Sequence, residues 1–227
     1  MATIAVPRQL ALVLPHGESF AREDFLDDSS NHQAAALIDQ WPDWPARAAL
    51  LVGPEGSGKS HLAAIWAERS GARLLAGRAL NTAALPVAMA TGALVVEDVA
   101  ADAIDEPALF HLLNMVKEQD GFVLITARSA PAGWSLRLPD LASRLRALPI
   151  VTLAAPDDPL LRAVMAKLFA DRQMAADPAL LDYLLNRIER SFSAARRAVD
   201  QLDRESLRQK RPVTRALAAE LLRLEET

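Results

Sequence analysis

A chain of 227 residues, 51% of them hydrophobic, is long enough for one α/β domain with a smaller domain appended. It contains no cysteine, which excludes a disulfide framework and a thiolate metal site and fits a reducing compartment. The formal net charge is -4. Residues 1–154 contain 12 Lys and Arg against 17 Asp and Glu, and residues 155–227 contain 13 against 12. Neither part has the positive excess that strong direct DNA binding requires, so a protein partner is expected.

The first patterned stretch, residues 8–15, alternates apolar residues in an extended register. It is either an edge strand or tail, or a linear peptide that docks into an apolar groove of another protein through Gln9, Leu10, Leu12 and Leu14. The start of the chain lacks a secretion-signal pattern, and no apolar run reaches bilayer length. We therefore expect a cytoplasmic protein without membrane contact.

An acidic loop over residues 20–28 carries Phe25 and Leu26. A helix is predicted over residues 32–40, with Ser30 as its N-cap, and the Trp41-Pro42 pair ends it.

Residues 50–60 combine a hydrophobic strand with a complete G-x-x-x-x-G-K-S phosphate loop, and a helix over 61–69 follows. Its three glycines are expected to take positive φ, so that successive N–H groups converge on phosphates at the start of the helix. Lys59 would reach the terminal phosphates and Ser60 would supply a hydroxyl to Mg²⁺. The flanking strand and helix favour a nucleotide site over an unliganded turn. The candidate nucleotide-binding residues are Gly53, Pro54, Glu55, Gly56, Ser57, Gly58, Lys59, Ser60 and His61.

An acidic motif is the second candidate functional element, and it comes after a short strand predicted over residues 73–75. Residues 93–98 form an apolar strand closed by Glu97 and Asp98. One carboxylate would orient Mg²⁺ and the next would polarise an attacking water. Two acids after a strand are otherwise a solvated turn, and Glu97 is one methylene longer than the Asp usual at its position.

The remaining elements of the α/β part are a helix over 107–119, a strand over 122–126, a helix over 139–146 and a strand over 149–153. The strand over 122–126 ends in Thr126, whose hydroxyl either senses a γ-phosphate or bonds local backbone. The helix over 139–146 presents Arg144.

Beyond Pro156, helix starts are expected at Asp158-Pro159, at Asp177-Pro178, at Ser191 or Ser193, and at Val213-Thr214. The predicted fold is α/β, with a parallel sheet between helices followed by a small all-helical lid. The predicted divisions are a peptide over 1–17, a nucleotide-binding domain over 18–154 and the lid over 155–227.

Four motifs taken in order resemble the DnaA-type AAA+ ATPases over roughly residues 18 to 225: residues 53–60, 95–98, 141–145 and 195–204. The initiators of that family carry a further DNA-binding domain, which is not expected here. The chain begins instead with the peptide around Gln9 and Leu10. This combination is similar to the regulatory inactivators of DnaA, which bind the replicative sliding clamp through such a peptide.

The resemblance implies a role for several single residues. Arg144, within Ser143-Arg144-Leu145, matches an arginine finger, and Arg196 matches the sensor 2 arginine of the lid. Phe25 and Leu26 match the loop that covers the adenine. Ala127 stands where the initiators tend to have the acid of sensor 1.

The function implied by the resemblance is regulation of replication initiation. With ADP or ATP and Mg²⁺ bound, the chain would dock onto the AAA+ domain of ATP-bound DnaA in the presence of the clamp, and Arg144 would drive hydrolysis there. Little or no turnover of its own is expected, and a homo-oligomer is compatible with the family. Two alternatives are a loader or remodelling ATPase that uses its own turnover, and an adaptor that binds nucleotide only for structure.

Overall fold

The structure, a computed structural model, describes Arg22 and residues 25–225. Its centre is a five-stranded parallel sheet in the order β2-β3-β4-β1-β5. The strands are β1 (Ala48–Val52), β2 (Arg73–Ala76), β3 (Ala93–Val99), β4 (Phe122–Ala127) and β5 (Ile150–Thr152). The predicted clamp-binding residues Gln9, Leu10, Leu12 and Leu14 lie outside the described residues.

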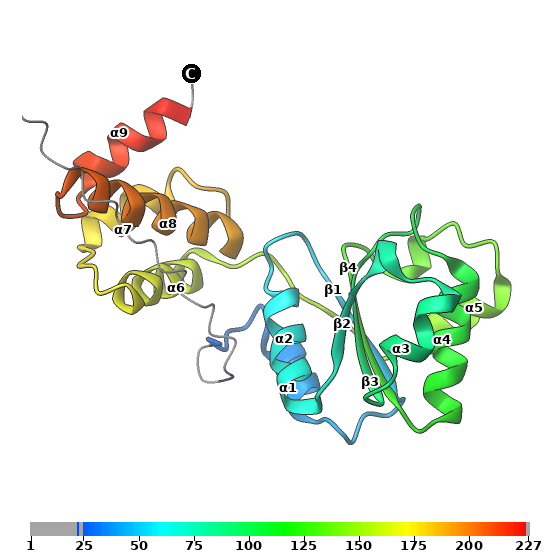
Figure 1. The fold of residues 1–227 in the computed structure, drawn as a ribbon. Coiled ribbons are helices and arrows are strands. Elements are labelled where there is room, and N and C mark those ends of the chain that lie inside the picture. Colours follow the sequence, from blue (N-terminus) through cyan, green and yellow to red (C-terminus); the bar gives the residue numbers. More distant parts are fainter. Residues whose placement is uncertain (1–21, 23–24, 226–227) are drawn as a thin grey trace, which may run out of the picture.

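Helices cover both faces of the sheet (Figure 1). One face carries α1 (His32–Asp39) and α2 (Lys59–Ser70), and the other carries α3 (Leu85–Ala88), α4 (Glu106–Glu118) and α5 (Pro139–Arg146). Short 3-10 turns lie over Gly77–Ala79, Thr82–Ala84 and Pro131–Gly133. A parallel sheet covered on both faces has strands that are apolar throughout, which is why all of β1 is buried.

The sheet separates two hydrophobic cores because alternate residues of each strand point to opposite faces. Leu50 and Val52 of β1 pack with the α3–α5 side, whereas Ala49 and Leu51 pack with the α1–α2 side. The α1–α2 core includes a cluster of aromatic side chains. In this cluster Trp66 of α2 is fully buried and stacks on Trp44, with ring centroids 5.2 Å apart.

The C-terminal part is all helical, as predicted. It contains α6 (Asp158–Asp171), α7 (Pro178–Leu185), α8 (Phe192–Gln209) and α9 (Arg215–Glu225). These helices share a third hydrophobic cluster that includes Phe169 and Val199. Figure 1 shows them gathered beside the sheet part, with the start of α8 turned toward the loop that follows β1. No helix in the described ranges is both long and apolar enough to span a bilayer.

Most predicted helix starts are confirmed by side-chain caps. Asp177 accepts the Leu180 N–H at the start of α7, Ser191 rather than Ser193 caps α8, and Thr214 accepts the Leu217 N–H at the start of α9. The prediction that Ser30 caps the first helix is wrong. The N-cap residue is Asn31, whose side chain instead accepts the Asp28 N–H and donates to the Leu26 carbonyl.

Candidate functional site

The candidate site lies where β1, β3 and β4 end side by side. The loop that follows β1 is joined to the end of β4 by the Gly53 N–H, which donates to the Ala127 carbonyl (3.1 Å). The end of β4 is joined to the end of β3 by Thr126, whose hydroxyl oxygen accepts the Asp98 N–H (2.9 Å). Carboxyl ends of parallel strands are where α/β proteins bind ligands, so strand order brings the two predicted motifs together.

The glycines of the phosphate loop serve two different needs. Gly56 and Gly58 have φ of 72° and 97°, the positive values predicted for them, which glycine adopts without steric cost. The prediction of positive φ at Gly53 is wrong. Glycine is required at position 53 because the backbone of Leu153, just beyond β5, approaches it closely. A Cβ on Gly53 would lie 2.5 Å from the Leu153 carbonyl oxygen.

Lys59 is buried at the base of the loop, with 5% of its surface exposed. Its Nζ donates to the carbonyls of Gly53 (2.8 Å) and Pro54 (2.7 Å). Burial lowers the pKa of the Lys59 ammonium, while the carboxylates of Asp98 and Glu55 act in the opposite direction. Within the described part of the chain, two carbonyls are the hydrogen-bond partners of this buried ammonium, which an anion would compensate better, so the loop fits a polyphosphate.

Two hydroxyls of the loop are placed differently. Ser60 is exposed at the start of α2, where a metal bound to a phosphate would meet it. Ser57 is buried, and its Oγ has no hydrogen-bond partner among the described residues. Within those residues no group of three or more acidic or histidine side chains forms a metal site.

The acidic pair sits in an irregular turn of β3. The register with β4 shifts between Val96 and Val99, and Asp98 has φ of 52°, a left-handed conformation that is uncommon for a residue other than glycine. Asp98 is exposed and Glu97 is half-buried. Such strain is kept where surrounding contacts enforce it, and here the Thr126 hydroxyl holds the Asp98 N–H.

Thr126 itself is fully buried. Its hydroxyl oxygen accepts the N–H of Asp98 from the neighbouring strand, whereas the alternative left open by the sequence was a bond to local backbone. Its contact with Asp98 makes it a residue that positions the acidic pair. Its predicted role toward a γ-phosphate remains untested.

The rings of Phe25 and Phe192 lie beside Gly58 of the phosphate loop. The Phe25 ring is buried and meets His61 edge-on, with centroids 5.4 Å apart. A Cβ on Gly58 would lie 3.3 Å from the Phe192 ring and 3.9 Å from the Phe25 ring. Leu26, next to Phe25, is half-buried. These rings form an apolar wall beside the phosphate loop, of the kind that a nucleobase requires.

The C-terminal helices contact the same loop. The Phe192 N–H donates to the Gly56 carbonyl (2.9 Å), and a Cβ on Gly56 would lie 2.4 Å from Ser191 Cβ. Arg196 follows one helical turn after Phe192 and is half-buried. The start of α8 is thus joined directly to the phosphate loop, which explains why Gly56 tolerates no side chain.

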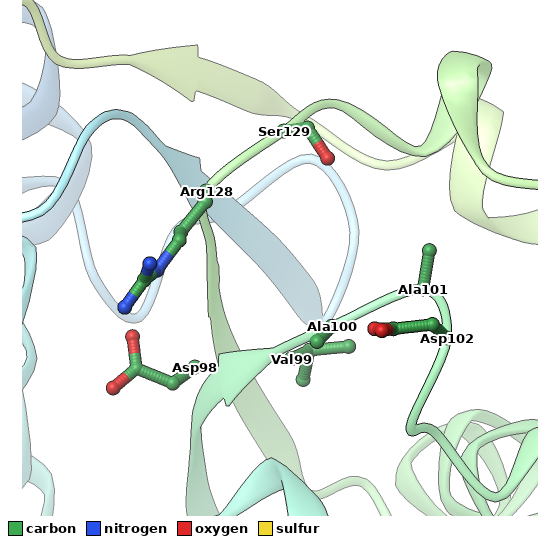
Figure 2. Close-up of a pocket in the computed structure, with 7 residues that line it drawn as sticks. All are labelled: Asp98, Val99, Ala100, Ala101, Asp102, Arg128 and Ser129. Carbon is green, nitrogen blue, oxygen red and sulfur yellow. The ribbon is translucent and has the colours of Figure 1, made fainter.

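Arg128 is a residue of this site that sequence analysis missed. It lines a cavity of about 250 Å³ with Asp98, Asp102 and Ser129 (Figure 2). Its Nη2 also donates to the Glu55 carboxylate in the phosphate loop (2.8 Å). The available signal was a cation two residues after the strand predicted over 122–126, but only the strand order places it beside the loop.

Arg144 lies away from this site. It is exposed on α5, on the face of the sheet opposite α2, and its guanidinium carbon lies 4.9 Å from the centre of the Phe110 ring of α4. No carboxylate of the described part of the chain pairs with it. The helices that carry Arg144 and Lys59, α5 and α2, therefore pack on opposite faces of the sheet.

No protein-family model matches the sequence. Among solved structures, domain III of the replication initiation protein DnaA from Thermotoga maritima aligns with a TM-score of 0.73 at 17% identity, covering 90% of this chain and 95% of that one. The Thermotoga maritima RuvB Holliday junction branch migration motor aligns with a TM-score of 0.71 at 16% identity, covering 91% and 72%. Replication initiator DnaA bound to AMPPCP and single-stranded DNA aligns with a TM-score of 0.66 at 15% identity, covering 84% and 68%. At these identities the likeness establishes the fold, an AAA+ phosphate-loop core followed by a helical lid.

Proposed function

We propose that this protein is a nucleotide-binding regulator of replication initiation, of the Hda type, which stimulates hydrolysis of the ATP bound to DnaA. The observation that carries the proposal is the position of Arg144. It lies on the face of the sheet opposite the chain's own phosphate loop, in a sequence that matches the arginine finger of DnaA-type proteins.

The chain's own nucleotide would serve mainly to hold the two parts together. Lys59 and the loop N–H groups would bind the phosphates of ADP or ATP, Ser60 and Glu97 would hold Mg²⁺ through its water shell, and the Phe25 ring with Leu26 would cover the base. Arg196 stands on α8, whose start already contacts Gly56. A phosphate bound by Arg196 and Lys59 together would fix the lid relative to the sheet. The bound group contributes charge and a metal; these residues orient it and exclude water.

A cation that cannot reach its own loop is suited to another protein's nucleotide. The Arg144 guanidinium rests against the Phe110 ring and has no acidic partner in the described part of the chain, so it is held in place while its charge stays available. An arginine at a developing phosphoryl transition state stabilises charge spread over the phosphate oxygens. DnaA, which holds ATP in a related loop, is the proposed recipient.

The sliding clamp is the second proposed partner, through Gln9, Leu10, Leu12 and Leu14. An extended peptide of this kind concentrates its affinity in a few anchors, so Leu10→Ala should weaken clamp binding by about 1–3 kcal/mol. A chain lacking residues 1–16 that still co-elutes with the clamp would remove the peptide from this role. The proposed setting is the cytoplasm.

The experiment that tests the proposal is single-turnover hydrolysis of DnaA-bound ATP, with and without this protein, the clamp and DNA. Stimulation that needs the clamp supports it. Equal rates with and without the protein would refute it.

A second candidate is an ATPase that acts through its own turnover, favoured by the strained Asp98 that Thr126 holds at the end of β3. Steady-state hydrolysis by the isolated chain distinguishes the two. A substantial rate that Asp98→Asn abolishes would support this candidate, whereas a negligible rate with intact stimulation of DnaA supports the regulator.

A further inference from the structure

The acidic turn of β3, residues 97–99, lies between the two strands that flank β3 in the sheet, β2 and β4. Regular pairing with β2 ends at the pair Ala76 and Glu97. Regular pairing with β4 is interrupted between Val96 and Val99. Because the turn leaves the regular ladder on both sides, other contacts must fix its backbone.

On the β2 side, the acidic turn packs against the backbone of Gly77. This glycine is buried and directly follows β2, at the start of a 3-10 turn. Its φ is not positive, so a glycine is needed here for close packing rather than for its conformation. A Cβ at residue 77 would lie 3.0 Å from Val99 Cα and 3.1 Å from each of the Glu97 and Asp98 carbonyl oxygens. All three neighbours are backbone atoms, which cannot rotate aside as the end of a flexible side chain can.

On the β4 side, the same turn is held by Thr126, whose buried hydroxyl oxygen accepts the Asp98 N–H. The backbone of Asp98 has φ of 52°, a conformation that surrounding contacts must enforce. The turn is thus bonded on one side and packed against backbone on the other. These two contacts set the position of the backbone from which the Glu97 and Asp98 side chains project.

We propose that Gly77 is a positioning residue for the acidic pair: the absence of a side chain there lets the turn sit where the carboxylates of Glu97 and Asp98 meet the water shell of a nucleotide-bound Mg²⁺. The inference rests on the proposed nucleotide site. A methyl group at residue 77 would displace the backbone of the turn by a few tenths of an ångström. Mg²⁺ requires near-ideal octahedral geometry, so such a displacement weakens the groups that orient its water. Gly77 acts through the backbone of the turn and offers no side chain to the ligand.

The test is calorimetric titration of the full chain with the non-hydrolysable triphosphate AMPPCP, in Mg²⁺ and in EDTA. The ratio of the two Kd values is the gain in affinity that the metal provides. Gly77→Ala should lower this gain roughly two- to tenfold, less than the 10–100-fold typical of a lost outer-shell partner, because both carboxylates remain. Binding in EDTA should match wild type, because the phosphate loop is unaltered.

The matched control is Gly133→Ala, which adds the same methyl group to another 3-10 turn. At residue 133 no atom of the described residues, chain neighbours apart, would lie within 4 Å of the new Cβ. This variant should leave the gain from Mg²⁺ unchanged.

A second measurement follows the turn without nucleotide. Hydrogen exchange of the Asp98 amide, recorded by NMR, should be faster in Gly77→Ala than in wild type or in Gly133→Ala, because the displaced turn weakens the bond to Thr126. Unchanged exchange would mean that the turn does not move, and it would overturn the inference.

The remaining outcomes separate this inference from the proposed function, with Glu97→Gln as the reference for a lost carboxylate. If Glu97→Gln lowers the gain from Mg²⁺ and Gly77→Ala does not, the inference is overturned while the nucleotide site stands. The same holds if Gly77→Ala weakens binding equally in Mg²⁺ and EDTA, or if it does not fold, since the glycine then serves packing alone. A wild-type chain that gains nothing from Mg²⁺, or does not bind AMPPCP, overturns the proposed site and the inference with it.

Discussion

The two faces of the central sheet are built alike and are suited to opposite tasks. The α1–α2 face packs Trp44 and Trp66 near Phe122 at the start of β4, and the phosphate loop, which surrounds a buried lysine, lies at the opposite, carboxyl end of the strands. The α3–α5 face packs leucines of α4 and α5 under an exposed arginine that rests on an aromatic ring. Under the proposed function, the phosphate loop receives an anion and the exposed arginine of the other face offers a cation. A regulator that binds its own nucleotide and acts on another protein's nucleotide needs both.

The sharpest test of this difference is Arg144→Ala. We expect stimulation of DnaA-bound ATP hydrolysis to fall by roughly 10³–10⁵-fold if the finger provides the whole effect, because a transition-state contact is lost. The chain's melting temperature and its own nucleotide affinity should not change. Arg146→Ala is the control on the same helix, since its side chain is exposed and, among the residues that the structure describes, donates only to the Ala142 carbonyl. Full stimulation by Arg144→Ala would refute the trans role.

A loss of stability, which Arg144→Ala should not cause, is expected from Trp66→Ala on the α1–α2 face. Trp66 is fully buried, stacks on Trp44 and meets Trp41 edge-on. Truncation should lower the free energy of unfolding by about 3–5 kcal/mol, measured by denaturant titration. Trp66→Phe, which keeps a ring, should cost less. A loss below 1 kcal/mol, on the scale of a surface substitution, would mean that this aromatic group is not the anchor of α2.

Lys59→Ala tests directly whether the phosphate loop binds nucleotide. A ligand that binds only the native state at a hundredfold excess over its Kd raises the stability by about 2.7 kcal/mol, and the variant should lose that gain. Thermal melts with and without ADP measure it. Without ADP the variant should melt no lower than wild type, because burial of a charged ammonium opposes folding. An ADP shift that persists in the variant would place the nucleotide elsewhere.

A smaller effect on the stimulation of DnaA is expected from Phe110→Leu on the α3–α5 face. The variant keeps an apolar side chain under Arg144 but removes the ring face that the guanidinium meets. The lost interaction of an exposed cation–π pair corresponds to about two- to fivefold in rate. Stimulation at saturation should fall while the concentration for half-maximal effect stays the same, and Phe110→Tyr should restore it. If Phe110→Leu and wild type behave alike, the ring only packs against α5.

The smallest expected effect is a pH dependence of stability. Burial lowers the pKa of Lys59 in the folded chain below its ordinary 10.5, so the unfolded chain binds the proton more tightly. The stability without nucleotide should therefore rise as the pH increases toward 10.5, and Lys59→Met should lack this contribution. Parallel slopes for the two proteins would show that Lys59 titrates alike in both states.

Local sequence was enough for the elements and most of their ends. The phosphate loop, the apolar strands and the caps at Asp177, Ser191 and Thr214 depend on residues within a few positions of each other, where backbone preference and nearby side-chain donors and acceptors decide the conformation. The exception at Asn31 also has a local cause, because its side chain bonds Leu26 and Asp28.

Tertiary structure alone decided how the charged residues combine. The order β3-β4-β1 brings Arg128 to Glu55 and the Thr126 hydroxyl to the Asp98 N–H, and the packing of α5 beside α4 puts Arg144 on the face opposite Lys59. The order in which strands pair is set by the burial of two whole cores, and no short stretch of sequence contains that information. The sequence therefore determined which groups this protein has for phosphate chemistry, and the fold determined which of them face its own loop and which face outward.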